Sequence, residues 1–98
     1  MLAFFLAALE SDEDRECFAE LYKQNISKME QTAMRILKNQ HDAEDAVQNA
    51  FVQIIRHFEK VYTIPRDRRP FWCICIVRNE ALYILRKNSL TIPLENCD

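Results

Sequence analysis

Polar side chains recur at helical spacing in the middle of the chain, from Asp42 onward. Positions i, i+3, i+4, i+7 and i+11 of one segment hold Asp45, Gln48, Asn49, Val52 and Arg56. This spacing places all five on one face of a helix. Carboxylate and amide groups on an exposed face can exchange hydrogen bonds with a protein partner. The same residues also fit a solvated face at the acidic start of a helix, so periodicity alone leaves both interpretations open.

Positive charge is concentrated in residues 60–88, which hold 7 basic and 2 acidic side chains, whereas residues 1–59 hold 6 and 11. Four aromatic residues are interspersed with these cations: Tyr62, Phe71, Trp72 and Tyr83. Cations attract phosphates and exposed rings stack on unpaired bases, so this composition is typical of single-stranded nucleic-acid binding. A solvated basic face with buried aromatic residues is the other interpretation that the composition allows.

No catalytic or metal-binding pattern stands out in the sequence. His41 and His57 have no Ser, Cys or metal-ligand partner at a useful spacing. The four cysteines lack C-x-x-C spacing, and Cys73 and Cys75 would point about 200° apart on a helix. No secretory signal precedes them, so we expect reduced thiols in the cytoplasm. We therefore expect a protein that is not an enzyme and uses neither a metal nor a cofactor.

Length and composition favour one small all-α domain, because 98 residues without a single glycine leave little scope for hairpins. Residues 1–10 are apolar but too short to span a membrane, which predicts a short packing helix. Ser11 and the three acids after it predict the start of a long helix that ends near residues 38–41. Its apolar stripe is Phe18, Leu21, Tyr22, Ile26, Met29, Ala33, Ile36 and Leu37.

A second long helix is predicted from its cap, Asp42, to about Lys60. Its buried stripe is Val47, Ala50, Phe51, Ile54, Ile55 and Phe58. Two prolines and four charges make residues 62–70 a loop. Pro70 then suits the first turn of a third helix, which we expect to end near Lys87.

The third helix has two candidate faces. Residues 71–77 could also form a buried strand, but no partner strand or hairpin turn lies nearby. As a helix, the segment is expected to bury Phe71, Ile74, Ala81, Leu82 and Leu85. The other face then carries Trp72, Ile76, Asn79, Tyr83 and Arg86. Arg78 falls on the expected buried stripe, which predicts a carboxylate partner for its charge.

Three segments resemble a known family in order and spacing. The stretches FAELYKQN, RILKNQHDAEDAVQNAF and IVRNEALYILRK are similar to region 2 of the bacterial sigma-70 factors of RNA polymerase, extracytoplasmic-function type. The resemblance covers roughly residues 10–88. It implies a compact bundle of three main helices plus the short N-terminal one, formed by residues 1–88. Residues 89–98 are expected to begin a linker, and the family's second domain, a helix-turn-helix, is not among these residues.

The resemblance also implies partners. The helix that matches residues 42–60 would dock on the clamp helices of the polymerase β′ subunit, with Asp45 and Gln48 at the most used positions. Asn49, Val52 and Arg56 would fill the same face. The last helix and the loop before it would melt the −10 promoter element and capture a flipped base of the non-template strand.

Residue roles at the DNA side follow from the same resemblance. Asn79 matches the asparagine of the base pocket, and Trp72 matches a tryptophan that either packs or stacks. Tyr83 stands where many members carry Asp, so the base preference stays open. Phosphate contacts are expected from the loop residues Arg66, Arg68 and Arg69, and further DNA contacts from Ile76, Tyr83 and Arg86 of the last helix. The alternative is a sigma-like interaction module without DNA activity that binds core polymerase or an anti-sigma factor.

Overall fold

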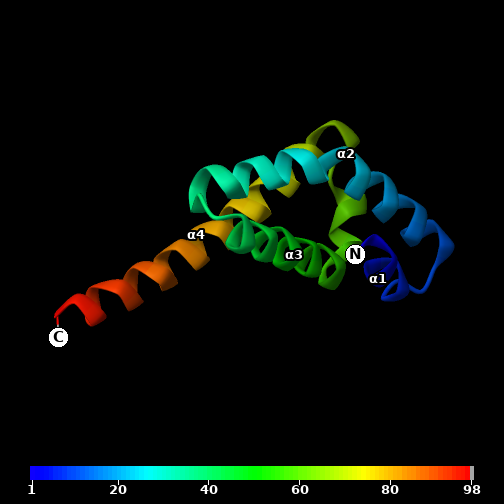
Figure 1. The fold of residues 1–98 in the computed structure, drawn as a ribbon. Coiled ribbons are helices and arrows are strands. Elements are labelled where there is room, and N and C mark those ends of the chain that lie inside the picture. The colour runs from blue at the N-terminus through cyan, green and yellow to red at the C-terminus, as the bar shows by residue number, and fades with distance from the viewer. Residues whose placement is uncertain (98) are drawn as a thin grey trace.

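The computed structural model describes residues 1–97 and the side chains of residues 1–89. Its elements are α1 (Leu2–Ala7), α2 (Asp12–Leu37), α3 (Gln40–Arg56), two 3₁₀ helices η1 (Phe58–Thr63) and η2 (Arg66–Arg68), and α4 (Arg69–Cys97). The described residues contain no strand. The prediction of an all-α domain with three main helices and a short N-terminal helix is therefore confirmed (Figure 1).

Local capping signals set the ends of α2. The Ser11 hydroxyl accepts a hydrogen bond from the Asp14 N–H at 3.0 Å, as the sequence predicts. At the other end, Lys38 adopts a left-handed conformation with φ 56° and donates its N–H to the Met34 carbonyl at 2.8 Å. Lys38 takes the position that glycine usually occupies, because the chain has no glycine to offer. The turn that follows brings α3 back along α2.

The predicted cap of α3 is wrong. Asn39, not Asp42, caps this helix, and its side-chain oxygen accepts the Asp42 N–H at 2.9 Å. Asn and Asp are about equally good caps, so residue type alone does not choose between them. The structure places Asp42 in the first turn, where its charge faces the positive end of the helix dipole.

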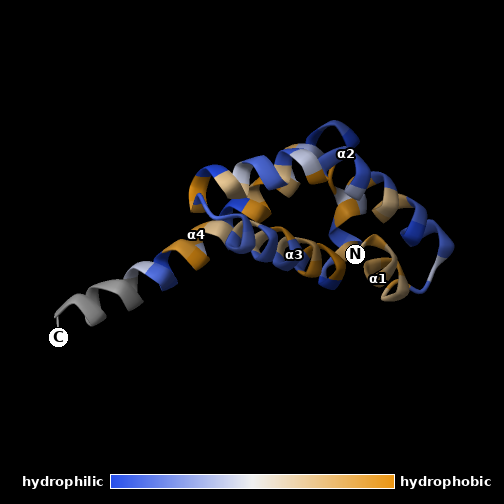
Figure 2. Ribbon diagram, in the orientation of Figure 1, coloured by the Kyte–Doolittle hydropathy of each residue, from blue (hydrophilic) through white to orange (hydrophobic). Residues whose placement is uncertain are grey.

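Three helices pack pairwise around one core, and α1 closes its end (Figure 1). The Phe5 ring lies 5.8 Å from those of both Phe18 and Phe51, and the last two rings lie 5.7 Å apart. This cluster joins α1, α2 and α3. Figure 2 shows that α1 is hydrophobic along its length, whereas α2 and α3 alternate between hydrophobic and hydrophilic residues. Burial of rings of this size is a main stabilising contribution in a small domain.

The buried stripe of α4 differs from the predicted one. Cys73, Val77 and Ala81 face the core, whereas Phe71 is 74% exposed and Leu85 is also exposed. Of the predicted stripe, Ala81 is buried and the remaining two residues, Ile74 and Leu82, are half-buried. Apolar residues occupy every side of residues 71–77, so periodicity cannot select the inner face.

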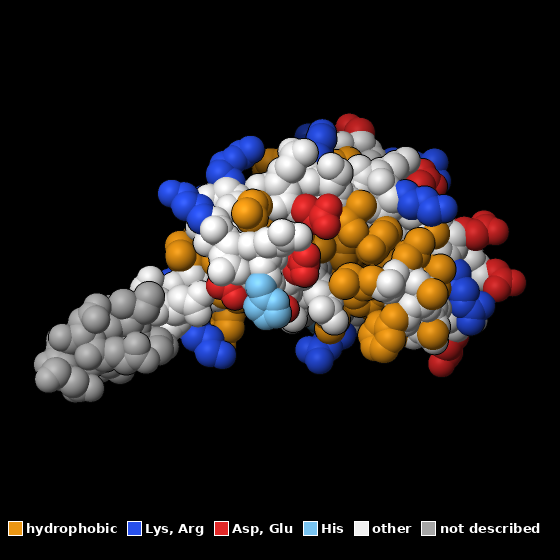
Figure 3. Space-filling view, in the orientation of Figure 1, with side chains coloured by type: hydrophobic (Ala, Val, Ile, Leu, Met, Phe, Trp, Pro, Cys, Tyr) orange, Lys and Arg blue, Asp and Glu red, His pale blue; other side chains and the backbone are white. Residues whose placement is uncertain are grey.

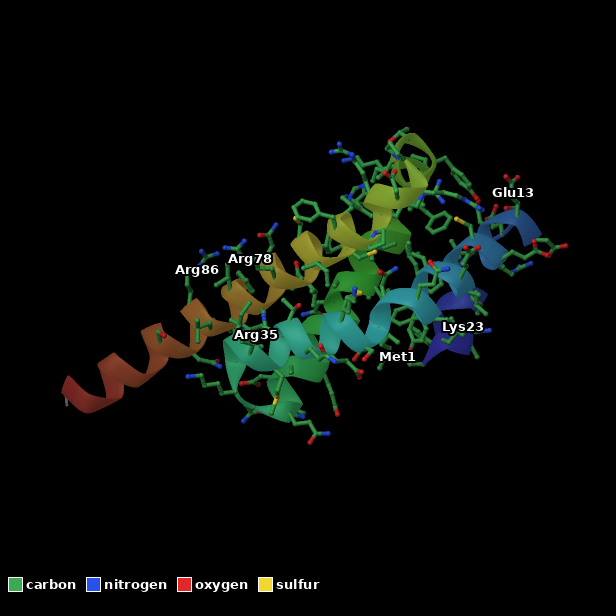
Figure 4. All side chains as sticks on the ribbon, turned by 90° about the horizontal axis from the view of Figure 1, so that it is seen from above. Met1, Glu13, Lys23, Arg35, Arg78 and Arg86 are labelled. Carbon is green, nitrogen blue, oxygen red and sulfur yellow. The ribbon has the colours of Figure 1, made fainter. Side chains whose placement is uncertain are left out.

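Arg78 provides a related correction. Because the inner face of α4 runs through Cys73, Val77 and Ala81, Arg78 lies on the exposed side of the helix. Its guanidinium is solvated there and does not require the carboxylate partner that the sequence predicts. Figure 4 shows Arg78 and Arg86 projecting to the same side of α4.

The loop between α3 and α4 and the end of α4 also depart in detail from the expectation. The loop contains the two 3₁₀ helices, and α4 begins at Arg69, so Pro70 lies in its first turn. Helix α4 continues past Lys87 to Cys97, so the polar Asn88 and Ser89 do not end it. The role of residues 89–98 as an interdomain linker stays a prediction, and Asp98 lies outside the described residues. No helix in residues 1–97 has the length and hydrophobicity that crossing a bilayer requires.

Candidate functional site

The outward face of α3 carries the predicted polar set. Asp45, Gln48, Asn49 and Arg56 are exposed and Val52 is half-buried, while Ala46, Ala50 and Ile54 anchor the opposite face in the core. Among the described residues, this set makes one ion-pair contact within its own helix, a long one of 3.8 Å between His41 Nε2 and Asp45 Oδ2, and both side chains are largely exposed. The hydrogen-bonding groups of this face are therefore available to a partner.

A hydrophobic area lies beside the outward face of α3. In Figure 3, hydrophobic side chains gather over α1 and the neighbouring turns, beside acidic side chains and a histidine. Met1 and Phe4 are among the exposed large hydrophobic residues, and Val52 is half-buried against the core. Such a mixture of apolar and polar groups is typical of protein-binding surfaces.

A groove separates the end of α3 from α4 and brings three predicted DNA-binding residues together. It has a volume of about 290 Å³ and is lined by Gln53, His57, Lys60, Trp72, Ile76, Asn79 and Glu80. Trp72, Ile76 and Asn79 are spaced i, i+4 and i+7, which aligns them along one side of α4. Amide, imidazole and ammonium groups beside an indole ring can hydrogen-bond and stack on an unpaired base.

Sequence reasoning missed four residues of this groove. In the structure only Gln53 belongs to α3, whereas His57 follows its end and Lys60 lies in η1. The three fall at i, i+4 and i+7 of the helix that the sequence predicts to reach Lys60, so their spacing could have marked a second polar side of that helix. That side is distinct from the one that holds Gln48. Glu80 gave no such signal, because its place depends on how α4 is rotated against α3.

Tyr83 lies in a different hollow, nearer the start of α3. This hollow, of about 380 Å³, is lined by Asp42, Asp45, Asn49, Tyr83, Ile84, Lys87 and Asn88. The Asn88 amide donates a hydrogen bond to Asp42 Oδ2 at 3.2 Å and joins the two helices there. The predicted polymerase face and the predicted DNA face therefore meet at this hollow.

The loop arginines lie in different surroundings. Arg69 Nε donates to the carbonyls of Val61 and Ile64, each at 3.1 Å, so its guanidinium is engaged within the loop. Arg66 and Arg69 line a hollow on the α2 side, away from the groove of Trp72 and Asn79. Arg66, Arg68 and, on α4, Arg86 are exposed.

The cysteines of the described part offer little reactivity. Cys17, Cys73 and Cys75 are free thiols. Burial raises the pKa of the Cys73 thiol to about 12. Burial also raises the pKa of the Cys17 thiol, and the opposing effect of the nearby Arg69 charge only reduces this rise. Within the residues that the structure describes, no group of His, Cys, Asp and Glu side chains is arranged to hold a metal ion.

The family model of sigma-70 region 2 matches residues 21–91, which is most of the chain and includes all of α3, the loop and most of α4. The comparisons with curated proteins and with solved structures give no match. The matched segment holds both the outward face of α3 and the groove beside α4. The chain therefore belongs to the sigma-70 family, as a region 2 domain.

Proposed function

We propose that this domain is the region 2 of a sigma factor of the extracytoplasmic-function type, which binds the β′ clamp helices and opens promoters at the −10 element. Sigma-70 region 2 is a non-enzymatic domain of transcription initiation that acts in RNA polymerase binding and promoter recognition. A role at the polymerase places its work in the bacterial cytoplasm.

The groove between α3 and α4 carries the DNA part of the proposal. Trp72, Ile76 and Asn79 line it together with Gln53 of α3, His57 at the end of that helix and Lys60 of η1. The amide of Asn79 can donate to and accept from a base edge, and the half-buried Trp72 lines the groove while packing on the core. A flipped base of the non-template strand fits this chemistry. Tyr83 and Arg86 lie further along α4, where they would contact the following nucleotides.

The outward face of α3 carries the polymerase part. Asp45 and Gln48 are exposed on a helix capped by Asn39 and can bond a coiled coil, with Asn49, Val52 and Arg56 around them. Charge-assisted and amide hydrogen bonds at the centre of such a contact become strong when the surrounding residues exclude water. Gln48 is the residue whose loss should affect this contact most directly.

The test is binding of the domain to a fragment that carries the β′ clamp helices and, separately, to single-stranded −10 DNA. We expect Gln48→Ala to weaken the protein contact by about 2 kcal/mol, roughly 30-fold, with no loss of folding stability. Gln31→Ala, an exposed glutamine of α2, is the matched control and should bind like the parent protein.

Three outcomes would change the proposal. Equal binding by the Gln48 and Gln31 variants would place the polymerase contact on another face. Polymerase binding without any single-strand binding would select the alternative, an interaction module that occupies polymerase or is held by an anti-sigma factor. Absence of both would remove the proposed role.

A further inference from the structure

The loop between α3 and α4 is held in place by contacts with α2. The Tyr62 hydroxyl donates a hydrogen bond to Asp14 Oδ1, across 48 residues of chain. Asp14 itself is fixed in the first turn of α2, where its N–H is bonded to the Ser11 cap. The Tyr62 ring packs edge-on against Phe58 with a centroid separation of 5.8 Å, and Phe58 is buried in the core. Tyr62 is therefore anchored at both its ring and its hydroxyl.

Arg69 provides a second anchor for the same loop. Its Nε bridges the Val61 and Ile64 carbonyls, and its Nη1 lies 4.0 Å from Cys17 Sγ on α2. Val61 is fully buried. One guanidinium therefore links the end of η1, the residue after it and the first turn of α4. The Val61 carbonyl also accepts the Ile64 N–H at 3.1 Å, so Arg69 adds a charged donor to a carbonyl that is already paired and supplies one to the Ile64 carbonyl.

Two exposed arginines of the loop lie just beyond these anchors. Arg66 and Arg68 belong to η2, whose turn is closed by the Arg68 N–H donating to the Pro65 carbonyl at 2.9 Å. Their backbone is thus ordered before any ligand arrives. A preformed loop avoids the entropy that a free one loses when it becomes ordered on binding.

We propose that Asp14, Tyr62 and Arg69 are positioning residues that hold the DNA-binding loop preformed against α2. The proposal rests on the proposed function, because it assigns a purpose to the order of a loop that would contact promoter DNA. It adds a new role for the acidic start of α2, which makes none of the contacts proposed for polymerase or DNA. The hydrogen bond to Asp14 also raises the pKa of the Tyr62 hydroxyl, which keeps it protonated as a donor.

The first experiment measures loop order without any ligand. Trypsin can cut after Arg66 and Arg68, both exposed in η2. Loss of one hydrogen bond should raise cleavage of Tyr62→Phe at these sites about fivefold over the parent. Tyr22→Phe is the matched control, because the Tyr22 hydroxyl makes no hydrogen bond within the described residues. Asp14→Ala should behave like Tyr62→Phe, and Asp14→Asn, which keeps an acceptor oxygen, should restore most of the protection.

The second experiment measures binding to single-stranded −10 DNA as a function of salt. Tyr62→Phe should weaken binding about fivefold with no change in the salt slope, since it removes no phosphate contact. The double variant with Asp14→Ala should bind no more weakly than either single variant, because both remove the same bond. Melting temperatures of all variants exclude general unfolding as the cause.

The outcomes separate the proposal from the function on which it rests. Equal cleavage of Tyr62→Phe and Tyr22→Phe would overturn the proposal, and so would increased cleavage with unchanged DNA affinity. A reduced salt slope in Tyr62→Phe would mean that Tyr62 affects phosphate contacts themselves and would also overturn it. If the parent domain binds no single-stranded DNA, the proposed function fails, and with it the DNA role of the loop. The trypsin result then still shows whether Asp14 and Tyr62 order this segment.

Discussion

The three loop arginines should respond differently to neutralisation. Arg66 and Arg68 are exposed, whereas Arg69 Nε is bonded to two backbone carbonyls. We therefore compare Arg66→Gln, Arg68→Gln and Arg69→Gln in binding to single-stranded −10 DNA. Charge is reduced by one in each variant, so any difference among them reflects position and not net charge.

The expected magnitudes follow from the contacts. Each phosphate contact on a single strand contributes about 0.7 to the slope of log K against log salt. Neutralising Arg66 or Arg68 should reduce the slope by about this amount. When the salt concentration rises fourfold, the affinity of the parent should therefore fall by a factor about 2.6 times larger than the affinity of either variant. Arg69→Gln should leave the slope unchanged. It should instead lower the free energy of unfolding by about 2 kcal/mol, because the two carbonyls of the loop lose a charged donor.

The assay is fluorescence anisotropy with a labelled oligonucleotide at salt concentrations from about 50 to about 200 mM, a range over which loss of phosphate contacts changes the affinity measurably. Urea denaturation supplies the stability of each variant. A salt slope that falls as far in Arg69→Gln as in Arg68→Gln would show that the Arg69 guanidinium contacts phosphate, and its proposed structural role would be wrong. Unchanged slopes in both Arg66→Gln and Arg68→Gln would place the DNA contact elsewhere.

Three further predictions concern the groove and the core. Asn79→Ala should weaken binding to the preferred single strand by about 1 to 3 kcal/mol and leave a scrambled strand nearly unaffected, and equal losses on both would make Asn79 a structural residue. Phe51→Ala should lower the free energy of unfolding by about 3 to 5 kcal/mol in urea titrations, because it removes the ring packed against those of Phe5 and Phe18; a loss under about 1 kcal/mol would contradict this packing. Burial raises the pKa of Cys73 to about 12, so the folded thiol stays neutral while the unfolded one loses its proton above pH 9. Stability should therefore fall as the pH rises above 9, and Cys73→Ala should lose less stability than the parent between pH 8 and 10; equal losses would show that Cys73 does not contribute.

Several features were predictable from local sequence. The Ser11 cap and the end of α2 near residue 38 depend on backbone groups a few positions apart, so neighbouring residues determine them. The outward face of α3 was also predictable, because apart from Val52 its large apolar residues fall on the other side from Asp45 and Gln48. The family could be suggested from the order of three segments, and the family match confirms region 2.

Tertiary structure decided what local patterns leave open. Residues 71–77 are apolar on all sides, so only packing against α2 and α3 selects Cys73 and Val77 as the inner face and leaves Phe71 exposed. The groove that holds Asn79 forms only because the rotation of α4 about its axis places Asn79 beside the end of α3. The engagement of Arg69 and the bond between Tyr62 and Asp14 join segments that the sequence separates. Periodicity reports the direction of a side chain relative to its own helix axis, whereas such contacts depend on how one helix is placed against another, for which a single helix carries no signal.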